Sequence, residues 1–241
     1  MSINIDKKKS STILLPETIP AFVEHPLVHF RQRYDWDCGL SCILMLLGRN
    51  ERRTFLADFK NICNDGGFGE STWTIDLCYI LKDFGLKHRY FTTTFGANQS
   101  HLGKEYYKCF NADETRVNEK FANASSCGIP IEIMSVSHQF LQEHLANHGN
   151  IILLTNASLL YCDLCKSNKL SMELRSCLGL KPTYMGHYII LCGYDQRIQK
   201  FLYRNPAFKD KVCFMSFDSI DKARKASGTD EDIIFLYDKQ L

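Results

Sequence analysis

The sequence lacks any long apolar run, and no stretch approaches the roughly 18 residues that suggest a membrane span. It also lacks a dominant charge, because 29 Lys and Arg stand against 27 Asp and Glu, for a net charge of +2. So small a net charge argues against nucleic acid or a membrane surface as partner. No internal repeat and, after residue 20, no low-complexity tract is visible, and the composition excludes collagen, coiled coils and wholesale disorder.

The N-terminus has no secretory signal, because its apolar run, residues 13–15, is far too short for one. We therefore expect a cytoplasmic protein, with the nucleus as an additional location. Residues 1–21 are expected to be a flexible polar tail. Composition shows no break in residues 22–241, and this length suffices for one core, so they are expected to form one domain.

Helical patterns come first along the chain and strand patterns follow. Helices are expected over residues 38–48, from a cap at Asn50 through Ile62, over 71–84 and 113–126, and after a cap at Ser137. Strands are expected over residues 86–95, 129–134, 150–155, 187–194, 200–205 and 233–237, with 157–185 resembling an insertion. This order predicts an α+β fold in which an N-terminal helical half packs on a C-terminal antiparallel sheet.

Cysteine, by contrast, is abundant, with 11 residues in the chain. Without a secretory signal we expect mostly reduced thiols that serve as small core side chains, among them Cys63, Cys78, Cys192 and Cys213. Cys162 and Cys165 have the CxxC spacing of zinc ligands, and Cys177 follows. A zinc site would need a fourth ligand, so free or redox-active thiols are the alternative, and no cofactor is expected.

Cys38 stands at the start of the first apolar helix, with Asp37 before it. Free N–H groups and the positive end of the helix dipole favour a thiolate there, so the sequence predicts an acidic thiol. Gln32 lies six residues earlier, where its amide could share an oxyanion hole with the Cys38 N–H. Gly39 is expected to leave room for a substrate.

His187 opens a buried strand, and Asn205 ends the next one. A histidine fixed on a strand can take the proton of the thiol and return it to the leaving group. An amide oxygen across the hairpin can hold the imidazole tautomer. Taken singly, Cys38 could be a core cysteine, His187 a structural histidine and Asn205 a turn residue. Their joint order, with Gln32, favours a catalytic triad.

Three motifs carry a resemblance to a known family. The pattern Q-x-x-x-x-D-C-G-L-x-C at residues 32–42, with GHYIILCGYD at 186–195 and NPA at 205–207, resembles papain-like peptidases that trim double-glycine leader peptides of bacteriocins. Those enzymes carry Asp where this chain has Asn205, and papain itself uses Asn. The resemblance implies a papain-like cysteine peptidase fold.

A second resemblance covers nearly the whole chain. The segments WDCGLSC, STWTIDL, ETRVN, CDLC, GHYIILCGYD and GTDEDIIFLY are similar to the eukaryotic guanylyl-cyclase-domain-containing family, whose name implies conversion of GTP to cyclic GMP. The carboxylate pair on strand ends that common purine cyclases use for metal is not recognisable in the sequence. The residues therefore predict a cysteine hydrolase that cleaves a peptide or isopeptide bond in a peptide or protein substrate. A non-enzymatic interaction module of the same fold and a guanylyl cyclase are the alternatives.

Overall fold

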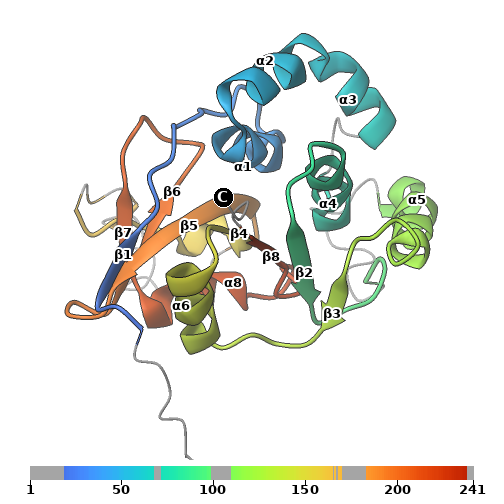
Figure 1. The fold of residues 1–241 in the computed structure, drawn as a ribbon. Coiled ribbons are helices and arrows are strands. Elements are labelled where there is room, and N and C mark those ends of the chain that lie inside the picture. Colours follow the sequence, from blue (N-terminus) through green and yellow to red (C-terminus); the bar gives the residue numbers. More distant parts are fainter. Residues whose placement is uncertain are drawn as a thin grey trace, which may run out of the picture.

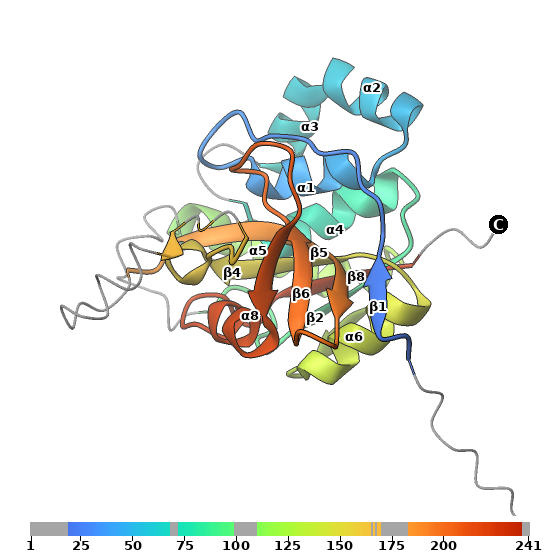
Figure 2. The same ribbon diagram turned by 90° about the vertical axis from the view of Figure 1, so that its left-hand side faces the viewer.

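The computed structural model describes residues 19–67, 72–98, 110–164, 166, 168–169 and 183–237. They form an α+β fold in which helices cover both faces of one sheet (Figures 1 and 2). The helices are α1 (Cys38–Leu46), α2 (Arg49–Ala57), α3 (Phe59–Gly66), α4 (Thr74–Asp83), α5 (Phe110–Asn123), α6 (His138–Asn147), η3 (Ala157–Leu159) and α8 (Phe217–Arg224). The strands are β1 (Phe22–Glu24), β2 (His88–Thr92), β3 (Ile131–Ile133), β4 (Ile151–Asn156), β5 (Gly186–Asp195), β6 (Lys200–Arg204), β7 (Cys213–Ser216) and β8 (Ile233–Leu236).

The sheet runs in the order β3-β2-β8-β4-β5-β6-β7, and β1 adds to β5. The predicted hairpin of β5 and β6 is present, and its register pairs Asp195 with Lys200. The pair β2 and β3 is parallel, and the other pairs are antiparallel. At Gly193 a Cβ atom would lie 2.0 Å from the Val23 carbonyl oxygen, so β1 can approach β5 only because this residue is glycine.

Two cores lie on opposite faces of the sheet. Strand β5 serves both, since Tyr188 and Ile190 join the core under α1 and α4, while Ile189 and Leu191 join the core against α6 and α8. This arrangement explains why the apolar runs of β4 and β5 do not alternate with polar residues. In Figure 2, α1 and α4 lie above the sheet and α6 and α8 below it.

The prediction of a C-terminal, wholly antiparallel sheet is wrong in two respects. Strands β1 and β2 come from the N-terminal half, and β2 pairs with β3 in parallel. The helix expected from Asn50 is two helices, because the chain breaks at Asp58, and the cap is Gly48. Strand β7 and helix α8 were not predicted from the sequence.

Other local predictions are confirmed. The Ser137 hydroxyl accepts a hydrogen bond from the Phe140 N–H and so caps α6. The helix expected to end at residue 84 ends at Asp83 with Phe84 as its C-cap, and Gly85 then adopts a left-handed conformation, with φ of 69°. Most of the expected insertion over 157–185 lies outside the described residues. Among those described, none of the helices is both long and apolar enough to span a membrane.

Candidate active site

The loop before α1 is shaped by the buried carboxylate of Asp37. It accepts hydrogen bonds from the backbone N–H of Arg33, at 3.0 Å, and of Tyr34, at 3.0 Å. It makes no side-chain cap bond to α1. Asp37 therefore folds residues 33–37 into a compact turn that ends at Cys38, and this turn fixes where the thiol enters the core.

The Cys38 thiol is held by backbone N–H groups. It is only 5% exposed, and the N–H groups of Tyr188 and Gly39 donate to its sulfur. Burial outweighs these bonds and the negative charge of Asp37 adds to it, so the pKa of Cys38 rises from 9.0 to about 11. The prediction of an acidic thiol is therefore wrong, because desolvation is stronger here than the helix start.

His187 and Asn205 meet across the β5–β6 hairpin. The imidazole Nε2 lies 2.8 Å from the Asn205 Oδ1 atom, and both residues are buried. The same Oδ1 accepts from the Ala207 N–H at 2.9 Å, which identifies it as oxygen. The ring must then donate through Nε2, so the neutral imidazole carries its lone pair on Nδ1. Burial lowers the pKa of His187, although the Asn205 bond opposes the shift.

Tyr188 brings the thiol to the strand that carries the histidine. Its N–H contacts the Cys38 sulfur, and His187 is the preceding residue. Among the described residues, however, the Cys38 thiol makes no hydrogen bond with the His187 ring. Catalytic hydrogen bonds are often long or poorly aligned in sites without substrate.

Gln32 lies beside Asn205 but its amide is engaged elsewhere. Its backbone N–H donates to the Pro206 carbonyl at 2.9 Å, which ties this loop to the turn after Asn205. Its side-chain Nε2 donates to the Tyr34 carbonyl at 2.9 Å, and Oε1 is buried without a partner in the described structure. The Nε2 group carries a second hydrogen, and this is the donor that it could offer to an oxyanion hole.

Gly39 serves packing rather than substrate access. A Cβ atom here would lie 2.9 Å from Leu77 Cδ1 and 3.1 Å from Tyr188 Cδ2. The missing side chain therefore lets α1 lie directly against α4 and β5, and the expectation of a substrate space at this residue is wrong.

The remaining cysteines follow the prediction of core packing where they are described. Cys63, Cys78, Cys192 and Cys213 are buried, and so is the zinc candidate Cys162. Cys165 and Cys177 lie outside the described residues. Within the described ranges, no group of three or more His, Cys, Asp or Glu is placed to hold a metal ion.

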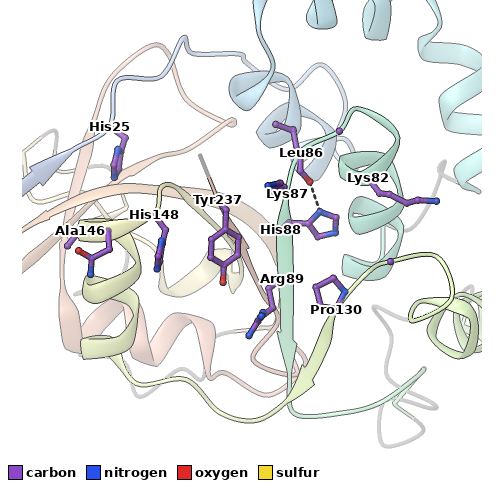
Figure 3. Close-up of a pocket in the computed structure, with 13 residues that line it drawn as sticks. His25, Lys82, Leu86, Lys87, His88, Arg89, Pro130, Ala146, His148 and Tyr237 are labelled. Atoms are coloured by element: carbon purple, nitrogen blue, oxygen red, sulfur yellow. Dashed lines mark hydrogen bonds between the residues drawn. The ribbon is translucent and has the colours of Figure 1, made fainter. Parts of the chain in front are cut away.

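A large cleft lies at the other end of β4. It has a volume of about 890 Å³ and wraps around the start of β2, with Tyr237 and His148 on one side and His88 and Pro130 on the other (Figure 3). His148 precedes β4, whereas Thr155, near the end of that strand, pairs with His187. The cleft is therefore separate from the Cys38 site. Its described lining carries six basic or imidazole side chains and no Asp or Glu: His25, Lys82, Lys87, His88, Arg89 and His148.

Sequence reasoning missed the buried polar group behind Cys38. Tyr188, Thr74 and Asp232 are linked by hydrogen bonds of 2.8 and 2.5 Å and come from β5, α4 and the residue before β8. The available signal was Asp232 itself, the last of three consecutive acids and the one directly before the apolar run IIFL. A carboxylate at that position is buried with its strand and must find partners.

Alkylation of individual thiols tests the shifted pKa of Cys38. A pKa of about 11 leaves about 100-fold less thiolate at pH 7 than the ordinary value of 9.0 does. We expect iodoacetamide at pH 7 to modify the half-exposed Cys127 well before Cys38, and the Cys38 rate to keep rising beyond pH 9, as followed by peptide mass spectrometry. Preferential reaction of Cys38 at pH 7 would show an activated thiolate instead.

Two comparisons relate the chain to known proteins. A family described as guanylylate cyclase matches residues 27–236, which span α1 through β8. A protein of Arabidopsis thaliana named "Guanylyl cyclase 1" is 34% identical over 223 residues, covering 90% of this chain and 78% of the plant protein.

Proposed function

The chain belongs to the guanylylate cyclase family, and we propose that within it this protein is a papain-like cysteine hydrolase that cleaves a peptide or isopeptide bond. The observation that carries the proposal is the His187–Asn205 hydrogen bond, which fixes the imidazole lone pair on Nδ1. That base sits one residue from the N–H that holds the Cys38 sulfur. In this proposal Cys38 on α1 is the nucleophile, His187 on β5 is the base, and Asn205, directly after β6, is the orienting amide.

The raised pKa of Cys38 and the lowered pKa of His187 determine the mode of attack. At neutral pH both side chains are uncharged, so His187 acts as a general base rather than as half of an ion pair. Nδ1 takes the thiol proton while the sulfur bonds to the substrate carbonyl carbon. The imidazolium, steadied by Asn205, then gives that proton to the amine as the C–N bond breaks.

A thioester to Cys38 remains after the amine leaves. A water molecule gives a proton to His187 and adds to the thioester carbon, the C–S bond breaks, and the thiol recovers its proton. The Cys38 N–H and the Gln32 amide would stabilise the oxyanion in both halves. The complete reaction consumes one water molecule and yields a carboxylic acid and an amine.

A peptide with an electrophilic carbon at its scissile position tests the proposal. We expect a peptide aldehyde or vinyl sulfone to modify Cys38 in the parent protein, with loss of labelling in Cys38→Ala and His187→Ala. Cys127→Ala is the matched control and should label like the parent, since this residue lies in the turn after α5, an element that carries none of the three triad residues. Equal labelling of the His187→Ala variant would remove His187 from the mechanism.

The second candidate, a guanylyl cyclase, is favoured by the names of the family and the plant relative. The observation in its support is the basic cleft, because Lys82 and Lys87 offer charge for a triphosphate and Tyr237 an aromatic face for a base. Arg89 is engaged by Glu132 at 2.5 Å. Among the residues that the structure describes, no group of three or more His, Cys, Asp or Glu is placed to hold a metal ion.

Formation of cyclic GMP from GTP with Mg²⁺ or Mn²⁺ tests the second candidate. Cyclase activity should survive Cys38→Ala and fall in Lys87→Ala, with the exposed Lys60→Ala on α3 as the matched control. Peptide labelling without cyclic GMP favours the hydrolase, and the reverse favours the cyclase. Absence of both activities favours the non-enzymatic interaction module.

A further inference from the structure

A chain of buried hydrogen bonds begins at Asp232. Its Oδ2 atom accepts from the Thr74 hydroxyl at 2.5 Å, and its Oδ1 atom accepts from the Tyr90 hydroxyl at 2.8 Å. Thr74 also lies 2.8 Å from the Tyr188 hydroxyl. Asp232 is 7% exposed, and Thr74, Tyr90 and Tyr188 are 2% exposed each. Residues of α4, β2 and β5 and the residue before β8 therefore meet in one buried polar group.

The chain reaches the Cys38 segment by two routes. The backbone N–H of Tyr188 donates to the Cys38 sulfur. The Tyr188 hydroxyl is 3.3 Å from the Thr72 carbonyl oxygen, and the Thr72 hydroxyl donates to the Trp36 carbonyl at 3.1 Å. Trp36 is two residues before Cys38. The ring of Tyr188, moreover, lies against Gly39.

We propose that Asp232 is a positioning residue for Cys38, and that gain or loss of its proton reverses the hydrogen bonds along Thr74 and Tyr188 and so changes the reactivity of the thiol. The consequence for catalysis rests on the hydrolase function proposed above. Its readout is the chemistry of the thiol, which requires no substrate.

Counting protons shows how the reversal works. An ionised Asp232 can only accept, so Thr74 must donate to it, and Tyr188 must donate to Thr74. A proton on Oδ2 lets Asp232 donate to Thr74, which then donates to Tyr188. The Tyr188 proton is freed for the Thr72 carbonyl. The two states thus differ in where the Tyr188 hydroxyl donates its hydrogen bond. With Asp232 ionised it donates to Thr74, and with Asp232 protonated it donates to the Thr72 carbonyl, which belongs to the segment bonded to Trp36.

The surroundings of Asp232 bring this reversal into the neutral range. The titratable groups that face it are Cys78 on α4, Tyr90 on β2, Tyr188 on β5 and Asp230 in its own segment. None of these four can carry a positive charge. Burial, with a smaller contribution from Asp230, raises the pKa of Asp232 from 3.8 to about 7.

The test is the rate of Cys38 alkylation by iodoacetamide between pH 5 and pH 9. Thiolate formation alone gives a tenfold rise per pH unit. In the parent protein we expect the alkylation rate to change by a further factor of about fivefold around pH 7, on top of that steady rise. We call this further change the step, and its size is the effect that one net hydrogen bond produces. Asp232→Asn should remove the step, because the amide donates to Thr74 and accepts from Tyr90 as the protonated acid does.

Two further variants locate the effect in the chain. Thr74→Val separates Asp232 from Tyr188 and should also remove the step, which decides the matter if Asp232→Asn does not fold. Tyr90→Phe is the matched control, since it removes a donor to the carboxylate outside the chain. It should keep the step and move it to higher pH.

A step retained in Asp232→Asn or Thr74→Val, or absent in the parent, would overturn the proposal. If the step behaves as expected but peptide electrophiles do not label Cys38, the positioning role of Asp232 stands and the hydrolase function is excluded. The two failures are therefore distinguishable.

Discussion

Cys38→Ala is expected to abolish peptide hydrolysis, with a loss in kcat/KM of at least about 10³-fold. The reason is chemical, because the acyl intermediate cannot form without the sulfur. The fold should survive, since the change removes one atom from a residue whose backbone still begins α1. Hydrolysis of a peptide pool, read by mass spectrometry of the products, measures the loss.

Two controls make this result interpretable. Cys127→Ala removes a thiol outside the site and should leave hydrolysis within about twofold, as expected for a surface change. Cys38→Ala itself should retain affinity for the substrate, so the variant should enrich a bound peptide or protein relative to the parent. Residual metal-independent hydrolysis in Cys38→Ala at the parent rate would contradict the assignment of the nucleophile.

The contact between His187 and Asn205 could be predicted because it is local. A turn over residues 195–199 joins two apolar strands, and such a hairpin brings its two ends together whatever the rest of the fold does. The cap at Ser137 is local in the same sense, because its partner, the Phe140 N–H, is three residues away. Sequence patterns suffice where both partners lie within one such unit.

The environment of Cys38 could not be predicted in this way. The helix start is worth up to about 2 kcal/mol to an anion in favourable geometry. Burial can shift a pKa by about 3 to 5 units, which is the larger effect. It depends on Tyr188 and Leu77, which lie against Gly39, the residue after Cys38, only when β5 and α4 pack on α1. The parallel pairing of β2 with β3 and the link from Thr74 to Asp232 are equally long-range.

Asp221→Ala is expected to lower the free energy of unfolding by about 3 kcal/mol, the largest stability effect that we expect of a single substitution here. Its partner is Arg224 on α8, whose side chain is fully buried. The Arg224 Nε donates to Asp221 Oδ1 at 2.7 Å, and Nη2 donates to the Val136 carbonyl at 2.5 Å. Without Asp221 the buried cation keeps, among the described residues, only Glu231, at 3.7 Å, as a counter-charge.

Urea denaturation measures this effect. The neighbouring, exposed Lys222→Ala should change the free energy of unfolding by less than about 0.5 kcal/mol. Adding Arg224→Met to Asp221→Ala should recover part of the loss, because an apolar side chain of similar length has no charge to leave unpaired. A loss below about 1 kcal/mol in Asp221→Ala would mean that water or Glu231 already compensates Arg224.

Arg224 also connects the stability of the fold to the candidate site, through its backbone carbonyl. The Arg224 carbonyl accepts from the Thr229 hydroxyl at 2.5 Å, and the Thr229 carbonyl accepts from the Asp232 N–H at 2.9 Å. The end of α8 therefore holds the turn that delivers Asp232 to Thr74. If Arg224 becomes less ordered, Asp232 should be held less firmly against Thr74. Asp221→Ala should therefore also reduce the size of the pH step in Cys38 alkylation, whereas Lys222→Ala should leave it unchanged. A stability loss with the step intact would separate the α8 anchor from the Asp232 chain.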